Sequence, residues 1–156
     1  MAIKIIKATE KYLDQMVKLS IEARQHHIDI LNGYYKPVIP TTEAEMLRQY
    51  IAQDKDHIML IAVDTNDIVL GMIWGEILYK PLLVKPNRGR ITNFVVSAQA
   101  RRQGIGKKLM DAFITDCKSR NIQEITLGVY NANKGSYDFY IEYGFEPIEQ
   151  IMSLKL

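Results

Sequence analysis

Residues 101–108, with the sequence RRQGIGKK, combine two glycines with four basic side chains. Gly104 and Gly106 stand where a strand-like run (90–97) ends and a helix-like run (104–121) begins. A helix N-terminus offers unpaired backbone N–H groups and a partial positive charge, and glycine lets a ligand approach the backbone closely. The turn is therefore predicted to bind an anion of the phosphate type.

The spacing of the glycines disfavours two common phosphate-binding loops. Nucleoside triphosphate hydrolases use G-x-x-x-x-G-K-[S/T], a spacing that Gly104 and Gly106 do not supply. The dinucleotide fingerprint needs a third glycine three residues after the second, where this chain has Leu109. A helix that simply begins with glycine beside a solvated basic cluster is the alternative that the residue types leave open.

A second polar pattern follows the strand predicted at 124–130. Asn133, Ser136 and Tyr140 are spaced as N-x-x-S-x-x-x-Y, and Gly144 and Phe145 come soon after. Together with R-x-x-G-x-G at 101–106, this pattern resembles the signatures of the GNAT superfamily of acyl-CoA-dependent N-acetyltransferases. The resemblance in element order extends over nearly the whole chain, and it implies a single domain over residues 1–156 with the acyl-CoA N-acyltransferase fold.

The resemblance implies that the turn holds the pyrophosphate of acetyl-CoA through backbone N–H groups. By the same resemblance, the strand before the turn splays from its neighbour, and its main chain binds the pantetheine arm and faces the thioester oxygen like an oxyanion hole. The residues implied to bind the cosubstrate are Phe94, Val95, Val96, Arg101, Arg102, Gln103, Gly104, Ile105, Gly106, Lys107 and Asn133. From the residues alone, 94–96 also fit a plain buried strand, and Asn133 fits a helix cap.

Tyr140 matches the family tyrosine that faces the coenzyme sulfur. A phenol with a pKa near about 10 can protonate a thiolate with a pKa near about 8.5 and still be neutral at neutral pH. Tyr140 is therefore the candidate general acid, although it also has the helical spacing of a core aromatic residue. The implied reaction is transfer of the acetyl group to a primary amine of a small molecule or peptide by direct attack in a ternary complex. A non-catalytic acyl-CoA-binding or regulatory domain of the same fold is the alternative.

The general base is where the chain departs from the family. Many relatives carry an acidic residue at the position of Thr92 or Asn93, and neither side chain can ionise here. Glu76, on the adjacent predicted strand, is therefore a candidate base. His26 and His27 border the expected acceptor side and have a suitable pKa for a base, and water is a further alternative.

The acceptor is expected against the first two helices, their joining loop (32–40) and the loop at 80–90. Tyr34, Tyr35 and Trp74 could form an aromatic wall for a cationic substrate. The basic residues of the second loop leave a negatively charged acceptor open as well.

Composition limits the partners and the cellular setting. Twenty basic against 18 acidic residues give a net charge of +2, which argues against nucleic acid as a partner. The single cysteine, Cys117, excludes an internal disulfide and a multi-cysteine zinc site, so we expect no metal and a reducing, cytoplasmic setting. The longest apolar run, at 58–63, is much shorter than the roughly 20 residues of a membrane span.

Hydrophobic periodicity predicts an α/β fold, with a central mixed sheet and helices on both faces. The unit from 90 to 130 should be parallel and the hairpin before it antiparallel. Thr42 is the expected cap of the second helix, with a glutamate three residues later. One or two strands are expected within 145–156, and they could join two copies of the chain in a homodimer. Strands are predicted at 3–9, 57–65, 67–79, 90–97, 124–130 and within 145–156, and helices at 10–30, 41–53, 104–121 and 134–144.

Overall fold

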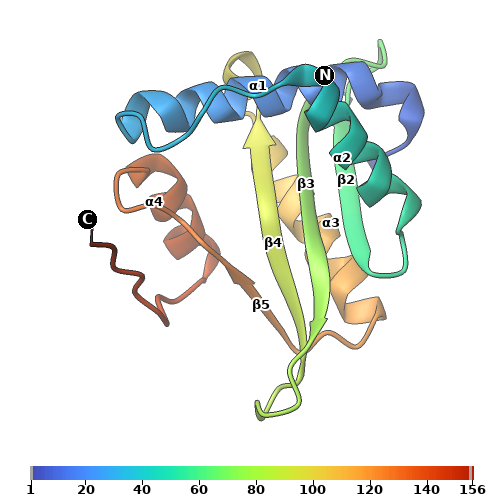
Figure 1. Cartoon of the computed structure of the whole chain (residues 1–156). Helices are drawn as coiled ribbons and strands as arrows, with labels where there is room; N and C mark the ends of the chain where they lie inside the picture. The colour runs from blue at the N-terminus through green and yellow to red at the C-terminus, as the bar shows by residue number, and fades with distance from the viewer. Residues whose placement is uncertain (1, 155) are drawn as a thin grey trace.

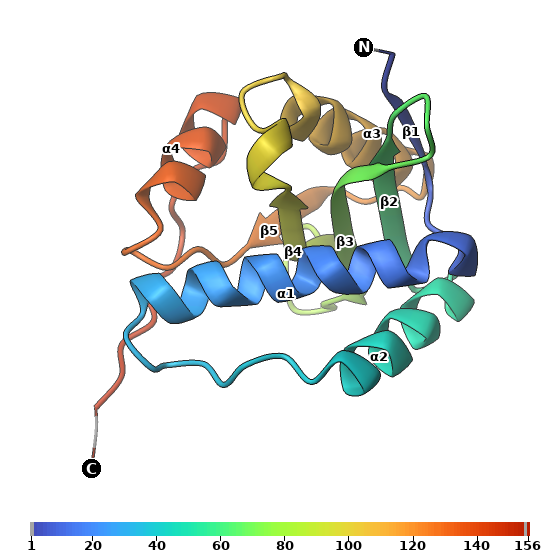
Figure 2. The same cartoon turned by 90° about the horizontal axis from the view of Figure 1, so that it is seen from above.

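The computed structural model of the chain describes residues 2–154 and 156. Five strands form one sheet in the order β1-β2-β3-β4-β5, and helices lie on both of its faces (Figures 1 and 2). This arrangement confirms the predicted α/β mixed sheet. The strands are β1 (Lys4–Lys7), β2 (His57–Val63), β3 (Val69–Tyr79), β4 (Asn87–Val96) and β5 (Glu124–Leu127), and the α-helices are α1 (Leu13–Ile30), α2 (Pro40–Ala52), α3 (Ile105–Ser119) and α4 (Lys134–Tyr143).

Two apolar layers hold the sheet between the helices. On one face, α1 and α2 bury Met16 and Leu47 against Trp74 of β3. On the other face, α3 buries Leu109 and Phe113 against the sheet. Because both faces are covered, β2 and the first half of β3 are continuous apolar runs without the alternation of a half-exposed strand.

The partners of β4 change along its length. Pairing is antiparallel from β1 through β4, whereas β4 and β5 are parallel and are connected through α3. The parallel pairing ends at Ile91 and Leu127, although β4 continues to Val96, still paired with Gly71 of β3. Figure 1 shows β4 and β5 diverging from this point. The predicted parallel unit and the predicted splaying of its two strands are both present.

A β-bulge lies at the start of the fork between β4 and β5. Trp74 of β3 is opposite Asn93, but the next residue, Gly75, is opposite Ile91, so Thr92 is an extra residue in β4. A bulge bends its strand and redirects the side chains beside it. Thr92 and Asn93 therefore lie in an irregular part of the strand.

The start of α2 differs from the prediction. The helix begins at Pro40, Ile39 is its N-cap, and no side chain caps it. The expected capping box at Thr42 is wrong, because proline is favourable at the first helical position and the helix already starts at Pro40, which puts Thr42 inside its first turn. A short 3₁₀ turn (Glu10–Tyr12) also precedes α1 within the helix predicted at 10–30.

The predicted closing strands are absent from the described part of 145–156. Gly144 ends α4 with a left-handed conformation (φ 110°), and Phe145 folds back onto Tyr140 and Tyr143. Beyond it, no backbone hydrogen bond joins residues 146–154 or 156 to the sheet. A strand forms only with a ladder partner, so the apolar pattern of this segment alone does not produce one.

Candidate active site

The glycine turn presents backbone N–H groups at the start of α3. Gly104 is the N-cap in the left-handed conformation (φ 75°), and no side chain caps the helix. The first backbone hydrogen bond that closes the helix runs from the Lys108 N–H to the Gly104 carbonyl, at 3.1 Å. The N–H groups of Ile105, Gly106 and Lys107 therefore have no partner within the helix, which suits the turn to an anion.

Gly106 has a packing role at the same place. A Cβ added there would lie 3.4 Å from the Phe94 ring and 3.5 Å from the Phe139 ring. Its missing side chain lets the first turn of α3 approach β4 and α4 closely. The turn is thus fixed beside the fork between β4 and β5.

The side chains of the turn mostly have partners within the protein. Arg101 donates from Nε to the Val96 carbonyl at 3.2 Å, and its guanidinium lies 4.0 Å from Glu22. Gln103 donates to a backbone carbonyl at 3.3 Å, and Lys107 pairs with Asp111 at 3.0 Å. The main chain of the turn, more than these side chains, is free to bind an anion.

The fork leaves one edge of β4 without a strand partner. From Thr92 to Val96, the side of β4 that faces away from β3 is not paired, because β5 has diverged. Within this stretch Val95 is buried and Phe94 is half-buried in apolar contacts. Side-chain packing and a free backbone edge coexist at Phe94, Val95 and Val96, and binding of the cosubstrate by this edge stays a prediction.

Tyr140 packs its ring among aromatic side chains. Its ring centroid lies 6.3 Å from that of Phe94, 5.6 Å from that of Phe139 and 5.8 Å from that of Phe145. Burial raises the pKa of Tyr140 to about 12. Its hydroxyl has no hydrogen-bond partner among residues 2–154 and 156, yet it is not among the side-chain polar atoms sealed from solvent there. A neutral O–H donor is therefore free to meet a ligand.

Asn133 caps α4. Its side-chain oxygen accepts a hydrogen bond from the Ser136 N–H at 3.3 Å, and its own carbonyl accepts one from the Tyr137 N–H at 3.0 Å. The N-x-x-S spacing thus has a local structural cause, because a cap residue bonds to the N–H three positions later. Contact of Asn133 with the pantetheine arm stays a prediction.

Glu76 faces α2 in a polar row across the sheet. Its neighbours in adjacent strands are His57 and Arg90. Arg90 Nη2 lies 2.7 Å from Glu76 Oε2, so one carboxylate oxygen is already bound. The Tyr50 ring of α2 stacks edge-on against His57, with 4.6 Å between centroids. Burial and the charge of Glu76 are the leading causes that raise the pKa of Tyr50.

An aromatic cluster joins the end of α1 to the loops after α1 and β5. The rings of Tyr34, Tyr35, Tyr130 and His27 lie within 5.5–5.9 Å of one another in five pairs, and the Tyr35 and Tyr130 hydroxyls share a hydrogen bond. The Arg24 guanidinium lies over Tyr35, 4.6 Å from its centroid. The half-buried Tyr35 ring is therefore covered by the protein's own arginine, whereas the Tyr34 ring is 61% exposed. Tyr130 was missed in the sequence because nothing local connects it with Tyr35.

Trp74 does not belong to the aromatic wall that the sequence predicted for the acceptor site. It is 2% exposed, lies in the core under α1 and α2, and contacts Tyr50 at 6.2 Å between centroids. The expectation that Trp74 lines the acceptor site is wrong, because β3 is buried on both faces at this position. His26 is exposed, whereas burial, followed by the charges of His26 and Arg24, lowers the pKa of His27.

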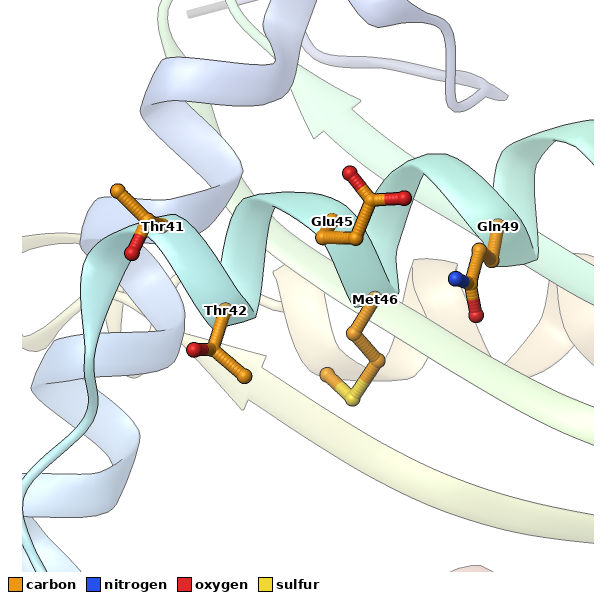
Figure 3. A pocket seen from close by; sticks show the side chains of 5 residues that line it. All are labelled: Thr41, Thr42, Glu45, Met46 and Gln49. Carbon is orange, nitrogen blue, oxygen red and sulfur yellow. The ribbon is translucent and has the colours of Figure 1, made fainter.

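A surface hollow lies along α2, away from the glycine turn. Thr41, Thr42, Glu45, Met46 and Gln49 line about 450 Å³ along one side of α2 (Figure 3). All five belong to a single helix, on the opposite side of the sheet from α3 (Figure 2). The hollow therefore has no contact with the glycine turn or the fork. In the described ranges, no group of three His, Cys, Asp or Glu side chains could hold a metal ion, and no helix is long and apolar enough to cross a bilayer.

Residues 24–145 match the model of the acetyltransferase (GNAT) family. The match spans α1 to α4 and includes both the glycine turn and Tyr140. The chain belongs to the GNAT family. No curated protein sequence matches this GNAT chain.

Solved structures share the GNAT fold over the whole chain. A variant of the BH1408 protein from Bacillus halodurans has a TM-score of 0.88 at 23% identity, with 100% of this chain and 99% of that chain covered. An aminoglycoside 6'-N-acetyltransferase from Acinetobacter baumannii has a TM-score of 0.81 at 18% identity, with 99% and 98% covered. A predicted acetyltransferase from Clostridium acetobutylicum, solved with acetyl-CoA, has a TM-score of 0.74 at 23% identity, with 99% and 96% covered.

Acetyl-CoA is the cosubstrate of the GNAT family, and the site fits it. Three N–H groups of α3 suit a pyrophosphate, and the unpaired edge of β4 offers hydrogen bonds to an extended amide-containing arm. Both features lie where β4 and β5 diverge.

Proposed function

We propose that the protein is an acetyl-CoA-dependent N-acetyltransferase that acts on a primary amine of a small molecule or peptide. The observation that carries the proposal is the placement of Tyr140. The Tyr140 ring packs near the Phe94 ring, and its hydroxyl has no partner in the described residues. Phe94 lies on the unpaired edge of β4 beside the glycine turn. Binding groups for a cosubstrate and a neutral proton donor are thus in one place.

Each part of the site has a separate task in this reaction. The cosubstrate supplies an activated acetyl thioester. The α3 N–H groups bind its phosphates, and the β4 backbone holds its arm and stabilises negative charge that develops on the thioester oxygen. Tyr140 gives its proton to the leaving thiolate. Glu76 is the base suggested by the sequence, and its Oε1 has no partner among the described residues.

The replacement Tyr140→Phe tests the assignment. We expect coenzyme A affinity to persist and turnover of a broad amine panel to fall by about 10- to 100-fold, because only the proton donor is lost. Thiol release from acetyl-CoA measures turnover. Tyr143→Phe is the matched control, since this tyrosine lies one turn later, also has its pKa raised to about 12, and bonds to Asp111 instead of facing free space.

Three outcomes separate the alternatives. Equal losses in both variants, or no loss in Tyr140→Phe, would remove Tyr140 from the chemistry. Tight coenzyme binding without thiol release for any amine would favour the non-catalytic acyl-CoA-binding or regulatory domain. Loss of coenzyme binding in Tyr140→Phe would show a packing role for its hydroxyl.

A further inference from the structure

The face of α1 that packs on the sheet changes character toward the C-terminal end of the helix. Leu13, Met16 and Val17 are buried in the apolar layer against the sheet. Seven residues after Val17 the same face carries Arg24, and His27 follows one turn later. Figures 1 and 2 show α1 crossing the sheet and ending on the side where α4 lies. The face is therefore apolar over the sheet and polar where the helix reaches the fork.

Ser20 lies at this change, one turn before Arg24. It is 3% exposed, and its hydroxyl oxygen is buried without a hydrogen-bond partner among the described residues. Buried polar atoms are nearly always hydrogen-bonded, so an exception needs an explanation. The polar part of the α1 face is thus not satisfied by the protein itself.

The Arg24 guanidinium has an aromatic support but no polar partner. Arg24 is half-buried, and its guanidinium lies over the Tyr35 ring, 4.6 Å from the centroid. It forms no ion pair or hydrogen bond with residues 2–154 and 156. A guanidinium stacked on a ring keeps its N–H groups in its own plane, where they can reach a ligand. Arg24 is therefore a positioned cation with its donors unused.

The acidic residues nearest to Arg24 in α1 have other partners. Glu22 accepts a hydrogen bond from the Ala98 N–H at 2.7 Å, which directs it to the end of β4. Asp29 is exposed and accepts a hydrogen bond from the Gln25 side chain at 2.8 Å. Neither carboxylate neutralises Arg24.

The aromatic cluster around Arg24 also supplies hydrogen-bond donors. The Tyr35 and Tyr130 hydroxyls share one hydrogen bond, which uses one of their two protons and leaves the other O–H as a donor. Burial, followed by the hydrogen bond with Tyr35, raises the pKa of Tyr130, so this hydroxyl is neutral at neutral pH. Burial also lowers the pKa of His27 and keeps its ring uncharged. The set formed by Arg24, His27, Tyr34, Tyr35 and Tyr130 thus contains one positive charge, several donors and no carboxylate.

This cluster closes the fork on the face opposite the glycine turn. Tyr35 comes from the loop after α1, and Tyr130 comes from the loop between β5 and α4, the helix that carries Tyr140. Their hydrogen bond therefore joins the two sides of the fork. The glycine turn lies at the start of α3, which packs on the other face of the sheet. A ligand held by Arg24 would approach the fork from the α1 face and would leave the α3 N–H groups free.

We propose that Arg24 binds a carboxylate of the acceptor, so that the acetylated amine belongs to an amino acid or a related amino carboxylate. The inference rests on the proposed acetyl transfer. One guanidinium donates two parallel hydrogen bonds to a carboxylate, which fixes the orientation of the acceptor as well as its position. The remaining O–H of the Tyr35–Tyr130 pair donates to the same anion. A purely cationic acceptor would instead be repelled by the charge of Arg24.

The test compares amino acids with their amides as acceptors, because the amide keeps the amine and the side chain and removes only the negative charge. The panel holds the common amino acids and a series of ω-amino acids of increasing length, and thiol release from acetyl-CoA gives kcat/KM. We expect the wild type to prefer the best amino carboxylate over its amide, and Arg24→Gln to reduce this preference by about 10- to 100-fold. The amine pKa differs between acid and amide, but this difference cancels when the preference is compared between variants.

Two further variants separate carboxylate binding from a structural role. Arg48→Gln is the matched control, because Arg48 is an arginine of α2 that contacts only Glu45, at 3.8 Å, and it should keep the full preference. Arg24→Lys keeps the charge but not the planar fork, so it should keep only part of the preference. Equal losses for acids and amides in Arg24→Gln would show that Arg24 only supports the Tyr35 loop, and would overturn the inference.

Binding of reaction products tests the same contact without turnover. The protein loaded with coenzyme A is titrated calorimetrically with the N-acetyl derivatives of the panel and with their amides. Tighter binding of an N-acetyl amino acid than of its amide by about tenfold or more, lost in Arg24→Gln, would support the carboxylate contact. If this pattern holds but the wild type releases no thiol with any amine, the proposed function fails and the carboxylate contact stands. Thiol release without any preference for a carboxylate would overturn the inference and leave acetyl transfer in place.

Discussion

The Tyr140 ring packs among three phenylalanines while its hydroxyl has no partner in the described residues. The sequence alone left core packing and acid catalysis as alternatives, and the structure combines a packed ring with an unpartnered hydroxyl, so packing does not exclude the proposed acid. Apolar surroundings keep the phenol neutral, because burial disfavours the phenolate. Tyr143, in the same helix, donates a hydrogen bond from its hydroxyl to Asp111.

The pKa of Tyr140 makes a prediction about pH. Because burial raises this pKa to about 12 from an ordinary 10.0, the acid form is present at lower pH and is lost only as pH rises through about 12. We expect kcat at saturating amine not to fall between about pH 8 and about pH 10.5. Steady-state rates across this range measure it. A descending limb near about pH 10 that disappears in Tyr140→Phe would contradict the prediction.

At the scale of elements, the β4–turn–α3 unit is the part that organises the site. The bulge at Thr92, the early end of β5 and the left-handed Gly104 together expose a backbone edge next to free N–H groups. None of these features depends on a charged side chain. The site therefore does not need the charges of Arg101 and Lys107, which form ion pairs with Glu22 and Asp111.

Gly104→Val is expected to weaken coenzyme A binding by at least about tenfold. A Cβ at Gly104 meets no protein atom within 4 Å, so the added branches would extend into the space before the α3 N–H groups. Gly33→Val is the matched control, because Gly33 also has a positive φ (83°) and open space around it but lies in the α1–α2 loop. Backbone strain of about 1–2 kcal/mol should be common to both variants.

Calorimetric titration with coenzyme A and urea unfolding of both glycine variants separate the two effects. Similar urea midpoints with loss of affinity only in Gly104→Val would support the site. Unchanged affinity in Gly104→Val would place the pyrophosphate elsewhere.

At the scale of the whole molecule, the two apolar layers are well covered, but the C-terminal segment and the tip of the β3–β4 hairpin keep highly exposed apolar side chains in solvent. Ile151, Met152 and Leu154 near the C-terminus are 85–89% exposed. Leu82 and Val84, at the tip of the β3–β4 hairpin, are 97% and 98% exposed. Figure 1 shows the tip extending beyond the helices and the C-terminal segment lying outside the sheet. Exposed apolar surface of this kind is typical of contact regions.

Self-association through the C-terminal segment is the prediction at this scale. We expect the wild type to be dimeric in sedimentation velocity and the variant Ile151→Ser with Leu154→Ser to be monomeric, since burial of these side chains would drive association. The double variant Leu82→Ser with Val84→Ser is the control and should stay dimeric, because these two side chains are also highly exposed but lie at the tip of the β3–β4 hairpin. A monomeric wild type at about 100 μM would refute dimer formation at a useful affinity.

The amino-acid sequence by itself indicated the glycine turn before a helix and most of the order of the elements, because glycine spacing and apolar periodicity act over a few residues. The acid at Tyr140 is implied by the resemblance to the family and stays a prediction. Only the tertiary structure decided where the fork begins, after Ile91, and the burial of Trp74. These depend on which strands pair, where the pairing stops and which helix covers which face. The closing strands were predicted wrongly for the same reason, since an alternating apolar pattern needs a partner edge that the local sequence does not specify.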